Sequence, residues 1–164
     1  MVAGPDPGHA FPAIALCLRF LAAGDTPVLL TGVEWLDTAR TAGLEAVELA
    51  GLDPGEDDDD SDAGAKIHQR AARMAVLNVP VLTDLGCDLV VSDVITACGG
   101  MAAELIGIPW VELSPHPLYL PSKGLPPVGS GLAPGTGVGG RLRDTVMRAF
   151  TARSVREGMR QRSA

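Results

Sequence analysis

Two side chains that can move a proton stand at corresponding points of the sequence. His9 closes the turn Ala3–His9, which follows a short strand, Met1–Ala3, and leads into an apolar helix. Asp93 directly follows a second apolar strand, Asp88–Ser92. Ligands of open α/β proteins bind at the carboxyl ends of parallel strands, so we expect both side chains on one rim. A carboxylate there would hold one imidazole nitrogen, fix its tautomer and stabilise the imidazolium formed on proton abstraction.

The remaining candidate groups carry weaker signals. His68 lies at the polar start of a predicted helix and His116 in a Pro-flanked loop, so we treat both as incidental, with His116 near the pocket. Ser114 follows a strand, but no Gly-x-Ser-x-Gly elbow surrounds it, which argues against a serine hydrolase. The run Gly135–Gly140 matches GxGxxG without a preceding strand, so a flexible loop entering a helix explains it better than a dinucleotide site.

The composition is that of a globular protein with an acidic charge balance. The chain has 164 residues, 46% of them hydrophobic, and a mean hydropathy of +0.22, which suits one domain over residues 1–164. A net charge of −7 argues against a nucleic-acid partner. Cys17, Cys87 and Cys98 lie in apolar contexts without a CxxC or Cys/His cluster, so we expect buried thiols, no metal site and a reducing compartment. No secretory signal pattern is present and the longest apolar stretch is too short to span a membrane, so we expect a cytoplasmic protein.

Strands and helices alternate along the chain, which predicts a parallel sheet with crossover helices. The predicted helices cover Pro12–Ala23, Glu34–Ala42, Ala63–Leu85, Ala97–Ile106 and Arg141 to about Arg160; the predicted strands cover Pro27–Gly32, Glu45–Leu49, Asp88–Ser92 and Pro109–Leu113. Pro80 predicts a break or kink in the third helix. The expected fold class is α/β, an open doubly wound parallel sheet of the Rossmann-like kind.

Two stretches, 51–62 and 115–140, are predicted to be mobile loops. The first contains the acidic run Glu56–Asp60, which we interpret as solvated; the alternative, a calcium site, lacks the Gly and terminal Glu spacing of an EF-hand. The second is rich in Pro and Gly, with scattered apolar side chains that could line a pocket for a hydrophobic ligand.

The last predicted helix is rich in arginine. It also carries Leu142, Val146, Phe150 and Met159, which could form an apolar face. We interpret it as a packed surface helix. Contact with a second domain, or peripheral contact with an anionic membrane, are the alternatives.

Two sequence blocks resemble, in order and spacing, the amino-terminal domain of GT-B glycosyltransferases. Within that fold, they are most similar to the macrolide and glycolipid glycosyltransferases related to the UDP-glucuronosyltransferases. The first block comprises Gly8–Pro12, Ala15-Leu16, Leu21–Asp25 and the strand Val28–Gly32; the second comprises Asp88–Asp93, Ala103–Pro109 and Val111–Pro115. The resemblance covers nearly the whole chain.

The resemblance implies the acceptor-binding half of a GT-B enzyme. The family's histidine that matches His9 acts as general base on an acceptor hydroxyl, and the aspartate that matches Asp93 pairs with it. The sugar moves with inversion from a nucleoside diphosphate sugar, such as a UDP-sugar, to a small hydrophobic acceptor, without a metal or other cofactor. The loop after Ser114-Pro115 would help to line the acceptor cleft. We expect the acceptor to contact Gly8, Phe11, Thr96, Ser114, His116 and Tyr119.

The sequence also departs from the family pattern. GT-B enzymes have a carboxy-terminal donor-binding domain, and no segment of this chain matches it. The first strand is short although it is central in this topology, so its loss should cost hydrogen bonds and burial. We therefore expect a fragment, a mis-set start codon or a split gene, and a chain that needs a separate donor-binding domain for activity.

Three alternatives stay open. The chain could be a non-catalytic module that binds an acceptor or a lipid. It could be related to the lipid-linked N-acetylglucosaminyl transferases of wall synthesis, although their first turn is richer in glycine. It could also be a Rossmann-like domain unrelated to sugar transfer.

Overall fold

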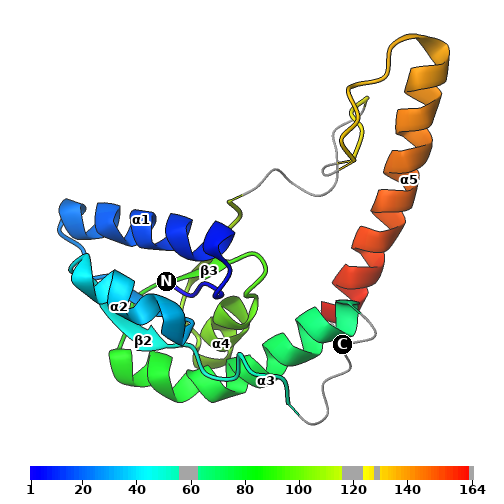
Figure 1. Cartoon of the computed structure of the whole chain (residues 1–164). Helices are drawn as coiled ribbons and strands as arrows, with labels where there is room; N and C mark the ends of the chain where they lie inside the picture. The colour runs from blue at the N-terminus through cyan, green and yellow to red at the C-terminus, as the bar shows by residue number, and fades with distance from the viewer. Residues whose placement is uncertain (56–62, 116–123, 128–129, 163–164) are drawn as a thin grey trace. The chain divides into compact units, whose positions relative to one another are not determined.

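The computed structural model describes residues 1–55, 63–115, 124–127 and 130–162, in two compact units, Met1–Pro115 and His116–Ala164. The acidic run at 56–60 and two predicted acceptor contacts, His116 and Tyr119, lie outside the described residues. The first unit contains the parallel strands and the first four helices, and the second contains helix α5, Gly137–Arg162 (Figure 1).

A parallel sheet organises the first unit. Strand β1, Val28–Thr31, pairs with β2, Glu45–Glu48, and β3, Val90–Asp93, pairs with β4, Trp110–Leu113. The amino-terminal segment joins the two pairs, because Val2 forms parallel bridges to Leu30 of β1 and to Ser92 of β3. The resulting order is β2, β1, the Val2 segment, β3, β4. This is the arrangement of a doubly wound Rossmann-like sheet, so the predicted fold class is confirmed.

Helices cover both faces of this sheet (Figure 1). Adjacent residues of a strand point to opposite faces. Leu29 therefore packs in a cluster with α1, Pro7–Ala23, and α2, Val33–Thr41, whereas Leu30 packs in a second cluster with α3, Ala63–Leu85, and α4, Cys98–Ile106. The two inner strands, β1 and β3, are buried on both faces, whereas the outer strands β2 and β4 are partly exposed.

Helices α3 and α4 make the second layer. Helix α3 spans Ala63–Leu85 and α4 spans Cys98–Ile106. Helix α4 approaches the sheet closely, because a Cβ placed on Gly99 would lie 2.8 Å from both the Ser92 hydroxyl oxygen and the Val2 Cβ. Glycine at this position is what allows the helix and the central strands to meet.

Two helix predictions need correction. Helix α1 begins at Pro7, not at Pro12, so Gly8 and His9 belong to its first turn rather than to the preceding loop. Pro7 suits this position because the first helical N–H groups have no intrahelical partner. Helix α3 is continuous through Pro80, so the predicted break is wrong, while the other predicted outcome, a kink, stays a prediction. Pro80 has no N–H to donate to the carbonyl of Val76, four residues earlier.

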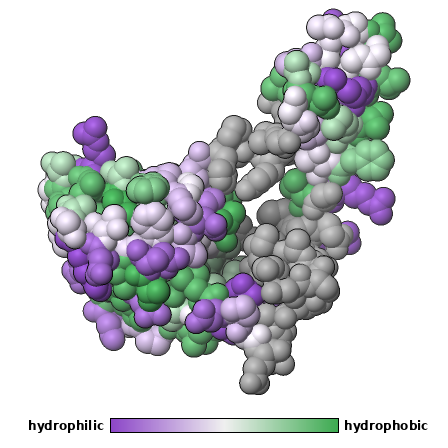
Figure 2. Space-filling view, viewed as in Figure 1, coloured by the Kyte–Doolittle hydropathy of each residue, from purple (hydrophilic) through white to green (hydrophobic). Residues whose placement is uncertain are grey.

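The second unit, His116–Ala164, contains the long helix α5. A carboxylate near the start of α5 holds that unit's preceding segment, because Asp144 accepts the Gly135 N–H at 2.6 Å and the Arg143 Nε–H at 2.7 Å. Burial alone would raise the pKa of Asp144, but these two donors hold that pKa below its ordinary value. The large apolar residues Leu142, Val146 and Phe150 are exposed, and Figure 2 shows hydrophobic and hydrophilic residues mixed over this helix.

Candidate functional site

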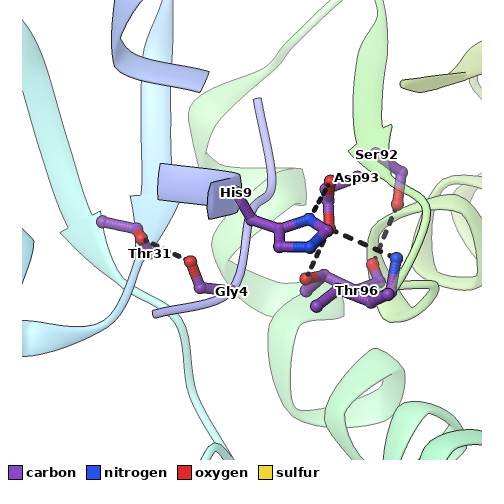
Figure 3. Close-up of polar contacts among 7 residues, drawn as sticks. Gly4, His9, Thr31, Ser92, Asp93 and Thr96 are labelled. Carbon is purple, nitrogen blue, oxygen red and sulfur yellow. Dashed lines mark hydrogen bonds and ion pairs between the residues drawn. The ribbon is translucent and has the colours of Figure 1, made fainter. Parts of the chain in front are cut away.

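The histidine and the aspartate singled out in the sequence form a buried pair. His9 Nδ1 lies 2.7 Å from Asp93 Oδ1, a hydrogen bond between residues 84 positions apart (Figure 3). His9 is 7% exposed and Asp93 is 1% exposed. A carboxylate so close to an imidazole in a buried site fixes the ring's orientation and favours the tautomer that carries its proton on Nδ1.

The topology of the sheet brings these two residues together. The Val2 N–H donates to the Val91 carbonyl and the Asp93 N–H donates to the Val2 carbonyl, so the amino-terminal segment lies directly beside β3. His9 is on the first turn of the helix that follows this segment, and Asp93 is the last residue of β3. The pair thus stands where the strand order reverses direction, which is the place where open α/β sheets bind ligands.

The Asp93 carboxylate is held on its second oxygen as well. Its Oδ2 accepts the Ile95 N–H at 3.2 Å and the Thr96 hydroxyl at 3.3 Å. The Thr96 N–H donates to the Asp93 carbonyl at 2.9 Å, and the Ser92 hydroxyl donates to the Thr96 carbonyl at 2.9 Å. This network leaves the carboxylate one orientation, with Oδ1 toward the imidazole (Figure 3).

Hydrogen bonds from α2 and β1 hold the turn that precedes α1. The Trp35 indole N–H donates to the Pro5 carbonyl at 2.6 Å, and the Thr31 hydroxyl donates to the Gly4 carbonyl at 3.5 Å. A Cβ on Gly4 would lie 3.0 Å from the Thr96 hydroxyl, so this turn packs tightly against the loop after β3. The backbone that carries His9 is therefore fixed from both sides.

A cleft of about 250 Å³ opens beside this network. Its walls come from the turn before α1, from the loop after β3, from Leu52 after β2 and from α3. Thr96 belongs to both features, since its hydroxyl bonds Asp93 and the residue lines the cleft. A larger hollow of about 790 Å³ lies at the opposite, amino-terminal edge of the sheet, near Met1 and Asp88, away from the His9–Asp93 pair.

The other predicted acceptor contacts are more scattered. Gly8 is exposed, with nothing within 4 Å of a Cβ built on it. Phe11 is 56% exposed and meets the Trp35 ring edge-on, with centroids 4.8 Å apart. Ser114 is half-buried just after β4. Among the described residues, the lining of the 250 Å³ cleft includes Thr96 but not these three, so their acceptor contact stays a prediction.

Sequence reasoning missed the residues that orient the aspartate. Ser92 and the Ile95 backbone N–H take part in the network, and Gly4 packs against Thr96, yet none of the three was a candidate. The available signal was the spacing of Asp93 and Thr96, since an Asp that bonds the N–H two residues ahead and a hydroxyl three ahead is a common local motif.

The cysteines and carboxylates give no sign of a metal centre in the described part of the chain. No group of three or more His, Cys, Asp or Glu side chains there could hold a metal ion. Cys17 and Cys98 are buried, as predicted, and Cys87 is half-buried. Burial raises the pKa of the Cys98 thiol to about 12, so this side chain acts as a small apolar group.

The sequence and the fold of this chain are similar to those of known enzymes. No protein-family model matches the sequence. The chain is 31% identical over 124 residues to an L-demethylnoviosyl transferase of Streptomyces niveus, which covers 67% of this chain and 32% of that protein. It is 26% identical over 176 residues to a 4'-demethylrebeccamycin synthase of Lentzea aerocolonigenes, covering 96% of this chain and 41% of that protein.

The fold agrees with these sequences. The glycosyltransferase SsfS6 of Streptomyces sp. SF2575, solved with thymidine diphosphate, matches with a TM-score of 0.56 at 22% identity, over 69% of this chain and 37% of that one. The chain resembles the GT-B glycosyltransferases. The resemblance stated from the sequence is thereby confirmed, and it is a resemblance to enzymes. This chain spans only about a third to two fifths of the length of these two curated relatives. No helix among its described residues is long and apolar enough to cross a membrane.

Proposed function

We propose that this chain is the acceptor-binding half of an inverting glycosyltransferase. It would position a hydrophobic acceptor so that one hydroxyl receives a hexosyl group from a nucleoside diphosphate sugar. The single observation that carries the proposal is the buried His9–Asp93 pair, 2.7 Å apart, next to the cleft that Thr96 lines. The similarity to glycosyltransferases supports the reaction class, and thymidine diphosphate bound to SsfS6 supports a nucleotide-sugar co-substrate.

The chemistry assigns one role to each member of the pair. With its Nδ1 proton donated to Asp93, the His9 ring has its basic lone pair on Nε2, which accepts the proton of the acceptor hydroxyl. The hydroxyl oxygen forms a bond to the anomeric carbon as the bond from that carbon to the diphosphate oxygen breaks. The nucleoside diphosphate leaves from the opposite face, so the configuration inverts. Asp93 stabilises the imidazolium that results.

The proposal calls for no resident cofactor. The nucleoside diphosphate sugar is a co-substrate, and we assign its binding to a separate donor-binding domain, as in the two-domain enzymes of this fold. The alternative is a non-catalytic module that holds an acceptor or a lipid, which the apolar residues lining the cleft would also suit.

The test is a transfer assay with matched variants. The chain, alone and mixed with the donor-binding domain of a two-domain GT-B glycosyltransferase, is incubated with UDP-glucose or TDP-glucose and a panel of hydrophobic hydroxylated acceptors. Glycosylated products are measured by mass spectrometry. His9→Ala should lower turnover by on the order of 10²–10⁴, because general-base assistance is lost. Asp93→Asn should also lower turnover, because the amide no longer favours the same tautomer.

The control is the same chemical change at the other end of that strand. Asp88 is exposed and lies just before β3, so Asp88→Asn should leave turnover unchanged. If His9→Ala keeps full turnover while chemistry limits the rate, the base assignment is wrong. If the chain binds acceptors but no product forms with any donor, donor half or variant, the non-catalytic module is the better description.

A further inference from the structure

The hollow of about 790 Å³ at the amino-terminal edge of the sheet has apolar walls on both sides. Leu82 and Leu85 of α3 line it on one face of the sheet, and Phe20 of α1 lines it on the other. Between these walls lie the first residues of β1 and β3. The hollow therefore continues, beyond Met1, the line that the amino-terminal segment follows through the sheet.

The backbone of the two flanking strands faces this hollow. On β1, the Leu30 N–H donates to the Met1 carbonyl, and the Met1 amino group donates to the Val28 carbonyl at 2.9 Å. On β3, the Val2 N–H donates to the Val91 carbonyl at 2.8 Å. In a parallel ladder, every second residue of a strand points both its N–H and its C=O to the same neighbour. The N–H groups of Val28 and Val91 therefore point into the gap just ahead of Met1.

The charged groups around the hollow are separated by depth. The Met1 amino group is half-buried at its inner end, and burial lowers the pKa of this group below its usual value. The carboxylates of Asp25, Glu45 and Asp84 are exposed and line its outer part. Among the described residues, no Lys or Arg lines the hollow. This arrangement favours a ligand with a negative charge at its inner end and positive charges at its outer end.

We propose that this hollow binds an extended peptide, which enters the sheet as a parallel strand between β1 and β3. The terminal carboxylate of the peptide lies against the Met1 amino group and accepts the Val91 N–H. The last peptide N–H donates to the Leu89 carbonyl, and the carbonyl before the last residue accepts the Val28 N–H. Such strand addition obtains affinity from backbone hydrogen bonds and specificity from pockets for alternate side chains.

The two walls define the side chains that the peptide should carry. Successive side chains of a strand point to opposite faces, and Val2 packs in the cluster that contains α3 residues. The last side chain of the peptide therefore packs against Leu82 and Leu85, and the one before it packs against Phe20. Both should be apolar, whereas the residues that reach the outer carboxylates should be basic.

The test is a calorimetric titration of the full chain with acetyl-Lys-Lys-Val-Leu-Val. The carboxamide of this peptide keeps the apolar contacts but lacks the terminal charge, so it should bind about tenfold more weakly. Methylation of the last peptide N–H removes the bond to the Leu89 carbonyl and should also weaken binding about tenfold. The reversed peptide, acetyl-Val-Leu-Val-Lys-Lys, has the same composition but would bury its lysines, so it should not bind.

Two further measurements locate the peptide. Hydrogen exchange of the Val28 and Val91 amides, followed by nuclear magnetic resonance, should slow on binding, because both N–H groups become bonded. Asp84→Asn should weaken binding about threefold, as expected for an exposed ion pair. Asp37 is exposed on α2 and does not line the hollow, so Asp37→Asn should leave the affinity unchanged.

A chain extended ahead of Met1 by Lys-Lys-Val-Leu-Val should fill its own hollow and no longer bind the free peptide. The inference is overturned by absence of saturable binding up to about 1 mM peptide, by equal affinity of the reversed peptide, or by unchanged exchange at Val28 and Val91. The hollow lies at the opposite edge of the sheet from the His9–Asp93 pair, so His9→Ala should bind the peptide normally. The peptide site and the proposed glycosyl transfer therefore stand or fail separately.

Discussion

The two compact units of this chain differ in charge and in the burial of their apolar side chains. The unit Met1–Pro115 has 5 Lys and Arg against 18 Asp and Glu, and it encloses two clusters of buried apolar side chains. The unit His116–Ala164 has 8 Lys and Arg against 2 Asp and Glu, and Leu142 on its long helix is 62% exposed. Among the described residues, the two buried apolar clusters lie in the first unit, around its sheet.

The polar groups show the same contrast. Asp93 and Asp144 are each almost fully buried and each accept several hydrogen bonds. Asp93 bonds an imidazole that is distant in sequence, which requires two strands to be correctly placed. Among the described residues, Asp144 bonds Gly135 and Arg143, both within nine positions of it. A local network can cap a helix, whereas a long-range one can build a site.

The largest difference between the units should appear in the cost of one identical substitution. Leu30→Ala removes a side chain that is 1% exposed, so the free energy of unfolding should fall by about 2–5 kcal/mol. Leu142→Ala removes an exposed side chain and should change that free energy by no more than about 0.5 kcal/mol. Urea denaturation of the full chain measures both. Equal losses would mean that Leu142 is buried in solution, and the contrast drawn above would fail.

A smaller effect should separate two glycines within the first unit. Gly99→Ala should cost about 1–3 kcal/mol, because the new methyl would overlap Ser92 and Val2. Gly8→Ala has open space and lies in the first turn of α1, so it should raise the free energy of unfolding by up to about 1 kcal/mol. The same denaturation experiment checks the pair. A stable Gly99→Ala variant would show that α4 can move away from the sheet.

The smallest effect concerns pH and the second unit. The pKa of Asp144 is lowered in the folded chain, so its contribution to stability is present above the ordinary aspartate pKa and is lost as pH falls through the lowered value. The Gly135 amide proton shift should therefore titrate with a midpoint below 3.8 by nuclear magnetic resonance. Asp144→Asn should abolish this titration and Asp88→Asn should not. A midpoint at or above the ordinary value would contradict the bonded geometry.

Much of the fold was predictable from local patterns. The strands β1 to β4 and the helix α3 lie close to their predicted bounds. The apolar runs of β1 and β3 and the glycines that follow β1 and α3 are local signals, which do not depend on the rest of the fold. The start of α1 was mispredicted, because Pro7 and Pro12 both suit a first helical turn and only the three-dimensional contacts of Gly4 and Pro5 select between them. The continuity of α3 through Pro80 was not predictable either, because a proline inside a helical pattern can break, kink or leave the helix continuous.

The sequence alone determined the residue types at the two strand ends, and hence that an imidazole and a carboxylate could meet at one rim of a parallel sheet. Only the tertiary structure decided that they do meet, at 2.7 Å, and that Thr96 and Ile95 orient the carboxylate toward His9. It also decided that a hollow opens beside Met1 at the opposite edge of the sheet. The reason is that hydrophobic periodicity fixes the local elements, whereas the approach of residues 84 positions apart depends on how those elements pack across the sheet.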